Sequence, residues 1–287
     1  MGKRYMILIG LMILLGILVF LKLTSATEWD ISTAVNVANK SIIGQDGSMR
    51  GLFINSSGTG MYLVGTVIQK VYQYQLSTPW DVTTATNTNN LSTAGQDTIT
   101  TGVFINDSGT GMYITGVTGD KVYQYQLSTP WLVTSATNTN NLSIIGQTTN
   151  ARDLFFNSSG TTMWVVSPTI TYVYTLSTAW LVTSATNTVN VTVLTETQMQ
   201  NIFINSSGTG MYMTGINQAK TYQFYLSTPW DISTYTNIVN LSMPESEMGG
   251  VVINSSGTGM YLTGVTNDNV YQYNLPPTQD TIAPKWS

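Results

Sequence analysis

Apolar and polar residues follow one another along this chain in a pattern that repeats about every 50 residues. In the first full copy, a short apolar run at 52–54 leads into the polar cluster 55–60, and a second apolar run follows at 61–64. Asparagine and glycine in such a cluster favour a tight hairpin turn. Each copy is therefore predicted to begin with two strands joined by a turn.

The next segment of each copy, 71–76 in the first, alternates between aromatic and polar side chains. Tyr72 and Tyr74 fall on one face and Gln73 on the other, which predicts a third strand. We expect the aromatic face to pack against the neighbouring copy. A segment rich in Thr and Asn, 85–93, predicts a fourth and outermost strand with one edge toward solvent.

The same copy occurs five times, as one turn asparagine and one tryptophan show. The asparagines are Asn55, Asn106, Asn157, Asn205 and Asn254, and the tryptophans are Trp29, Trp80, Trp131, Trp180 and Trp230. A fixed period of this length, built from short strands, is typical of a β-propeller in which each repeat forms one blade.

The two ends of the repeat region complement each other. Residues 28–45 contain a fourth strand without the three that should precede it, and the last copy, 251–275, has three strands without a fourth. The N-terminal strand would complete the last blade and protect its edge from open pairing. The fold class predicted is all-β: a closed five-bladed propeller of four-stranded repeats over residues 27–275.

Two sequence phrases recur along the chain with variations, and every blade contributes to them. Residues 53–65 read Phe-x-x-x-Ser-Gly-Thr-x-Met-Tyr-x-x-Gly, and residues 71–81 read Val-Tyr-Gln-Tyr-x-Leu-Ser-Thr-Pro-Trp-Asp. Over 28–275 the chain resembles the YVTN-type propellers of surface proteins and the uncharacterised propeller-repeat proteins of phage and microbial surfaces. That resemblance implies an architecture and a surface location, but no particular activity, because one fold hosts many tasks.

The N-terminal segment predicts on which side of the cytoplasmic membrane the repeats lie. Lys3 and Arg4 precede an apolar run over 5–21, which predicts one hydrophobic helix ahead of the repeats. Residues 1–26 are either a signal peptide cleaved after Ala26 or a membrane anchor that is retained. In both cases the repeats lie outside the cytoplasmic membrane. We expect an extracellular or cell-surface protein that touches the membrane only through this segment, if it is retained.

The amino-acid composition argues against several classes of function. Charged residues are only 8% of the chain, and 14 acidic residues face 10 basic ones without a basic patch, which argues against nucleic-acid binding. There is no Cys and no His, so thiol nucleophiles and the commonest general base are missing. We therefore expect no enzyme activity and no cofactor.

The loops between second and third strands, and those between repeats, should share one face and differ from blade to blade. This candidate binding face carries acidic residues from several blades: Asp46, Asp97, Glu196, Glu245 and Glu247. They either hold a hard cation such as calcium or only keep the loops soluble. A glutamine from each of four blades either binds carbohydrate or, as we favour, forms polar packing: Gln73, Gln124, Gln223 and Gln272.

Each blade also contains two Asn-x-Ser/Thr sequons, which are acceptors for N-glycosylation. The set in the hairpin turn is Asn55, Asn106, Asn157, Asn205 and Asn254, and the set in the fourth strand is Asn39, Asn90, Asn141, Asn190 and Asn240. Duplication of one blade would copy a chance sequon as faithfully as a used one. The sequence therefore leaves modification of these sites open.

The C-terminal tail, 276–287, leaves the repeat pattern and contains three prolines, which favour an extended form. It is either a frayed end or a strap that docks on another subunit with Trp286 as its anchor. The function predicted is a non-catalytic surface structural or adhesion module, with self-association or a protein or glycan partner, and possible use as a filament or coat subunit. The alternatives are a virion- or phage-associated receptor-binding protein, and a propeller hydrolase or lactonase with loop carboxylates and a divalent metal.

Overall fold

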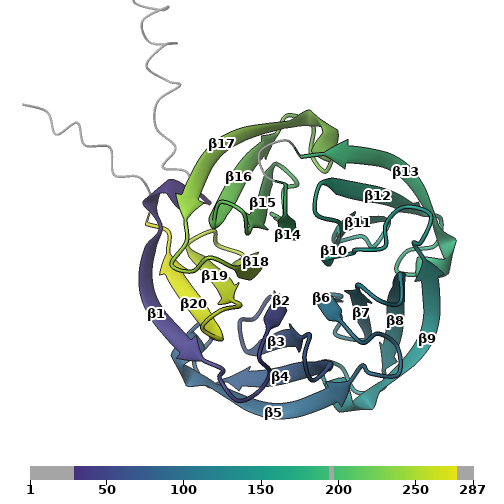
Figure 1. The fold of residues 1–287 in the computed structure, drawn as a ribbon, viewed down its shortest axis with the longest axis horizontal. Coiled ribbons are helices and arrows are strands. Elements are labelled where there is room, and N and C mark those ends of the chain that lie inside the picture. The colour runs from purple at the N-terminus through teal and green to yellow at the C-terminus, as the bar shows by residue number, and fades with distance from the viewer. Residues whose placement is uncertain (1–28, 194–196, 277–287) are drawn as a thin grey trace, which may run out of the picture.

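Five antiparallel four-stranded sheets stand around a central axis like the blades of a wheel (Figure 1). The structure is a computed structural model and describes residues 29–193 and 197–276. Blade I contains β2 (Met49–Ile54), β3 (Gly60–Gly65), β4 (Lys70–Leu76) and β5 (Ala85–Ser92). Blade II contains β6 (Thr100–Ile105), β7 (Gly111–Gly116), β8 (Lys121–Leu127) and β9 (Ala136–Ser143).

Blades III and IV follow in the same order. Blade III contains β10 (Asp153–Phe156), β11 (Thr162–Val166), β12 (Ile170–Leu176) and β13 (Ala185–Thr192). Blade IV contains β14 (Met199–Ile204), β15 (Gly210–Gly215), β16 (Lys220–Leu226) and β17 (Tyr235–Ser242). In each blade the first strand lies against the axis and the fourth forms the rim (Figure 1). The predicted five-bladed all-β propeller is therefore confirmed.

Blade V is assembled from both ends of the described chain. It contains β18 (Met248–Ile253), β19 (Gly259–Gly264) and β20 (Asn269–Asn274), and its outer strand is β1 (Val35–Ser41). β1 pairs antiparallel with β20, so that Asn39 stands opposite Tyr271 (Figure 1). The predicted closure by an N-terminal strand is confirmed, and it leaves no blade with an incomplete sheet.

Three-residue 3₁₀-helices precede the outer strands: η1 (Ile31–Thr33), η2 (Val82–Thr84), η3 (Val133–Ser135), η4 (Val182–Ser184) and η5 (Ile232–Thr234). In the part of the chain that the structure describes, no helix is long and apolar enough to cross a bilayer. The predicted hydrophobic helix and signal or anchor, 1–26, lie outside the described residues. So does the tail with Trp286, apart from Pro276.

Aromatic residues of the third strands fill the spaces between blades, as predicted. Tyr72 and Tyr74 of β4 are buried in one cluster with Val252 and Tyr261 of blade V. Burial of such large side chains contributes about 1.5–3 kcal/mol each. The aromatic stripes are therefore part of the core, and they are not available as platforms for an external ligand.

The predicted glutamine packing is confirmed, and it has a specific geometry. In four blades the third-strand glutamine reaches across to the next blade and accepts a hydrogen bond from the backbone N–H that opens its 3₁₀-helix. The pairs are Gln73 with Val133 at 3.1 Å, Gln124 with Val182 at 3.0 Å, Gln223 with Ile31 at 3.0 Å and Gln272 with Val82 at 3.1 Å. These side chains are occupied in holding blades together.

Candidate functional site

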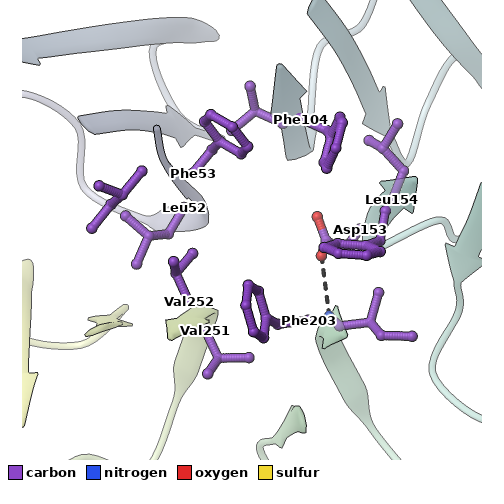
Figure 2. A pocket seen from close by; sticks show the side chains of 12 residues that line it. Leu52, Phe53, Phe104, Asp153, Leu154, Phe203, Val251 and Val252 are labelled. Atoms are coloured by element: carbon purple, nitrogen blue, oxygen red, sulfur yellow. Dashed lines mark hydrogen bonds between the residues drawn. The ribbon is translucent and has the colours of Figure 1, made fainter. Parts of the chain in front are cut away.

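Aromatic side chains gather at one mouth of the central channel. The same position of the innermost strand carries a phenylalanine in four blades and a valine in the fifth: Phe53, Phe104, Phe155, Phe203 and Val252. Their rings lie next to one another, as in the 5.4 Å contact between the ring centroids of Phe53 and Phe104. Figure 2 shows Phe53, Phe104 and Phe203 arranged around the channel.

Five tryptophans surround this inner ring, each in the segment that leads into a fourth strand. Each adopts a left-handed backbone conformation, with φ between 64° and 80°, which non-glycine residues seldom adopt. In blade I the backbone N–H of Trp80 donates to the Gly58 carbonyl at 2.9 Å. The indole lies flat against Gly58, where a Cβ would come within 2.4 Å of the ring.

A second contact fixes the tryptophan from the neighbouring blade. The hydroxyl of Tyr261 in β19 donates to the carbonyl of Trp80 at 2.8 Å. Equivalent bonds join Tyr62 to Trp131, Tyr113 to Trp180 and Tyr212 to Trp29, at 2.7–2.8 Å. These tryptophans therefore lie in the gaps between blades, and the tyrosine bonds hold four of the five in their strained conformation.

Together these residues form a concave site, which we call the aromatic bowl. It is a cavity of about 190 Å³ lined by Trp29, Phe53, Ile54, Ser56, Trp80, Phe104, Asp107, Phe155, Phe156, Ser158, Trp180, Phe203, Ile204, Ser206, Trp230, Val252, Ile253 and Ser255. Its wall is mainly aromatic, and its rim carries four serines and one carboxylate, Asp107. An apolar concavity with a few converging polar groups is the usual form of a small-ligand site.

A smaller cavity of about 40 Å³ continues the bowl down the channel, and Asp153 of β10 lines it. The Asp153 carboxylate is 3% exposed and accepts a hydrogen bond from the Ile202 N–H of blade IV at 3.1 Å (Figure 2). Burial raises the pKa of Asp153 well above its usual value, although the hydrogen bonds from Ile202 and Leu154 oppose this. Burial therefore disfavours the charged form of this carboxyl beneath the bowl.

The opposite mouth of the channel is polar. Arg50 of β2 donates to Gln200 Oε1 of blade IV at 3.1 Å and to Glu247 Oε2 of blade V at 3.4 Å. Arg152, at the equivalent position of blade III, lies close enough to Arg50 and Glu247 to feel both charges, and burial is the main cause of its lowered pKa. The two mouths thus differ: one is aromatic and nearly uncharged, and the other carries charge.

The acidic loop residues predicted as a binding face mostly have structural roles. Asp46 is 3% exposed and accepts hydrogen bonds from the N–H groups of Ser48, Val67 and Ile68. Asp97 is 2% exposed and binds the turn over 117–119 in the same way. Both loops therefore lie on one face, as predicted, but these carboxylates are directed into the blade.

Glu245 also accepts two backbone N–H groups, those of Thr266 and Asn267, and is 6% exposed. Glu247 pairs with Arg50, and Glu196 lies outside the described residues. Within 29–193 and 197–276, no three acidic side chains come together as a metal site would require. The alternative that these residues only keep the loops soluble is wrong for Asp46, Asp97 and Glu245, because each is buried.

The two sequon sets have different environments. The turn asparagines Asn55, Asn106, Asn205 and Asn254 are only 6–9% exposed, whereas the outer-strand asparagines Asn39, Asn90, Asn141, Asn190 and Asn240 are all exposed. The repeat pattern predicts both sets to be exposed, and this holds only for the outer-strand set. In the turn set the side chain folds back on its own hairpin.

The aromatic bowl was missed in the sequence because its residues also form the core. The one available signal was the phenylalanine that recurs in the first strand of four blades, two residues before the turn asparagine. Arranged around an axis, the four phenylalanines and the valine of the fifth blade form a ring, and a single copy gives no sign of it.

No family model and no curated protein matches the chain. Among solved structures, a functionally unknown protein from Desulfotomaculum acetoxidans matches with 9% identity and a TM-score of 0.44, over 75% of this chain and 62% of that one. The β-propeller domain of Cps50 (Swd1) from Myceliophteria thermophila matches with 10% identity and a TM-score of 0.48, over 85% of this chain and 100% of that one. At this level of similarity the identification of the fold rests on the strand topology, and the molecule is a five-bladed β-propeller.

Proposed function

We propose that this propeller is a non-catalytic module of an extracellular or cell surface that binds the neutral end of a carbohydrate in the aromatic bowl. The bowl is the observation that carries this function. Its wall offers flat apolar faces to the apolar side of a sugar ring, and hydroxyls of Ser56, Ser158 and Ser206 lie at its rim to meet the sugar's own hydroxyls.

The size and charge of the bowl limit the kinds of ligand that it can bind. Its volume of about 190 Å³ is below the roughly 300–1,000 Å³ of sites for drug-sized molecules, so it suits one ring at the end of a longer chain. Asp107 is the single ionisable group in the lining. An uncharged ring is favoured, because an anion would meet a carboxylate and no compensating cation.

Binding without turnover is supported by the chemistry of the lining residues. The chain has no His and no Cys, and the bowl presents one carboxylate where glycoside hydrolysis needs two. Three loop carboxylates of the hydrolase alternative, those of Asp46, Asp97 and Glu245, are bound to backbone N–H groups. Adhesion to a host glycan, including use as a receptor-binding protein of a virion, would employ the same bowl; a filament or coat subunit would not require it.

Titration with neutral oligosaccharides while following tryptophan fluorescence tests this function. A saturable change is expected, since Trp80, Trp180 and Trp230 line the bowl. Ser206→Arg places a large charged side chain at the exposed rim and should weaken binding about tenfold or more, equivalent to about 1.4 kcal/mol. Thr188→Arg, an exposed site on the outer strand β13, should leave it unchanged.

Two results would contradict the proposal. One is the absence of any saturable response to a panel of neutral glycans. The other is equal loss of binding in both arginine variants, which would point to net charge and not to the bowl.

A further inference from the structure

The outer strands of the five blades carry one asparagine each at the same register. Asn90 of β5 stands opposite Tyr72 of β4, and Asn39, Asn141, Asn190 and Asn240 stand opposite the equivalent tyrosines of their blades. Each begins an Asn-x-Ser/Thr sequon. The asparagines therefore form a belt around the rim, away from the aromatic bowl and from the polar mouth.

Strand geometry presents both reactive parts of these sequons to solvent. In a β-strand, residues i and i+2 lie on one face and residue i+1 on the other. Asn90 and Ser92 are both exposed, whereas Leu91 between them is turned inward and packs with the core of blade II. Exposed side chains also occupy both sequon positions in the other four outer strands.

The hydrogen bonds of the outer-strand asparagine leave its nitrogen free for modification. Asn90 Oδ1 accepts from Asn87 Nδ2 at 2.9 Å, and Asn141 and Asn240 accept in the same way from Asn138 and Asn237. Asn90 Nδ2 donates to no residue in the described part of the chain. A glycan attached to Nδ2 keeps Oδ1 as an acceptor, so the support of Asn87 would survive modification.

The turn asparagines provide a contrast within the same molecule. Asn55 Oδ1 accepts from the N–H groups of Thr59 and Gly60, both at 3.0 Å, and Nδ2 points back to Thr59 Oγ1 at 3.4 Å. The whole side chain is 7% exposed. A glycan on this nitrogen would have to displace the hairpin that the asparagine organises.

From this contrast we propose that the outer-strand set, Asn39, Asn90, Asn141, Asn190 and Asn240, carries N-linked glycans and that the turn set does not. The result would be an equatorial belt of oligosaccharide that leaves both mouths of the channel open. The proposal rests on the extracellular location in the proposed function, but not on sugar binding by the bowl.

A belt of glycans on the outer strands would also protect the edges of the blades. Each outer strand has one edge without a strand partner, and such edges pair with other chains unless they are protected. The edges here are rich in neutral Thr and Asn, with few of the charged residues that usually prevent such pairing. Bulky hydrated sugars on every edge would supply that protection.

Glycopeptide mapping of the full-length chain, secreted by a eukaryotic host and purified as folded monomer, tests the belt. We expect occupancy at outer-strand sequons and none at turn sequons. Ser92→Ala abolishes the sequon of Asn90 without altering that asparagine, and should remove one glycan. The matched variant Ser57→Ala abolishes the sequon of Asn55 and should leave the glycan count unchanged.

Each other outcome counts against the proposal. Chain that is secreted and folded but unmodified overturns the belt while the extracellular location stands. Folded chain with equal occupancy in both sets overturns the distinction between them. Chain that is retained inside the cell and unmodified contradicts the belt and the location together, and oligosaccharide binding by that material would still report on the bowl.

Discussion

At one position of the innermost strands, the residue type sets how closely neighbouring blades approach one another. The equivalents are Gly51, Gly102, Asp153, Asn201 and Gly250. A Cβ at Gly51 would lie 2.8 Å from the Thr101 carbonyl oxygen of the next blade, so this approach requires glycine. Asp153 and Asn201 instead use a side-chain oxygen to accept the N–H of Ile202 and Val251 respectively.

Asp153→Asn should therefore stabilise the protein at neutral pH. The amide keeps the oxygen that accepts the Ile202 N–H, as Asn201 does in the next blade, and it cannot ionise. Because burial raises the pKa of Asp153 in the folded state, the unfolded chain releases this proton first as the pH rises from about 3.9. The free energy of unfolding then falls by about 1.4 kcal/mol per pH unit until the folded-state pKa is reached.

Urea unfolding between pH 3 and pH 8 measures this effect. The variant and the parent should be nearly equal at pH 3, and the advantage of the variant should grow as the pH rises. A constant difference across the range would show that Asp153 is not the titrating group.

The sequence predicted where a residue lies in the fold better than it predicted what its side chain does there. The sequence located Asp46 in a loop between blades, but it could not show that the carboxylate turns inward to accept the N–H groups of Val67 and Ile68. That role requires the loop of Asp46 to lie on the same face as the turn that contains Val67 and Ile68, which are 21 and 22 residues further along the chain. Side-chain direction in a loop has no periodic signal from which to read it.

At the scale of elements, the seam between blades III and IV differs from the other four. Val173 stands where the other blades have the glutamine that reaches the next 3₁₀-helix, and Trp164 replaces the tyrosine that donates to the next tryptophan. Trp164 stacks on Trp230 at 5.9 Å, but its buried indole N–H has no hydrogen-bond partner among the described residues. This seam therefore lacks both polar links.

Val173→Gln should restore one link by offering an acceptor to the Ile232 N–H of η5. A hydrogen bond of this kind contributes about 0.5–1.5 kcal/mol, and a small increase in the free energy of unfolding is expected in urea titrations. The reverse change, Gln73→Val, removes the 3.1 Å bond to Val133 and should destabilise the blade I–II seam by a similar amount. If both changes are destabilising, the seam is shaped for valine and the link cannot be transferred.

The strands themselves could be predicted well, because period-two alternation and turn residues are local signals. The third strand at 71–76 and the hairpin at 55–60 both appear as predicted. For the contacts between blades, the sequence predicted aromatic and polar packing but not which residues would pair. Gln73 and Val133 are 60 residues apart, so their hydrogen bond follows from ring geometry and not from either segment alone.

At the scale of the whole molecule, closure depends on the pairing of β1 with β20. A chain that begins at residue 42 lacks β1 and Trp29, and thereby exposes the edge of β20 and removes the carbonyl that Tyr212 binds at 2.7 Å. We expect this chain to lose about 5 kcal/mol or more, the whole stability of a marginal domain, and to associate through the open edge.

Thermal unfolding followed by circular dichroism, together with size-exclusion chromatography, measures this loss. A chain that begins at residue 29 serves as the control and should unfold in one transition as a monomer. Addition of a peptide spanning 29–41 should rescue the shortened chain, because a free edge accepts a matching strand. A shortened chain that stays monomeric and as stable as the control would show that the ring does not need this clasp.

Ring closure also fixes how the molecule can be attached to anything else. Both ends of the described chain emerge beside the aromatic bowl, since Trp29 lines it and Thr33 Oγ1 donates to the Pro276 carbonyl at 2.9 Å. A tag or support joined at either end would therefore bring the bowl toward the attachment surface and hinder entry of a large glycan. Immobilisation through the opposite, charged face, for example by a label at Ile68 in the turn between β3 and β4, would leave the bowl directed outward.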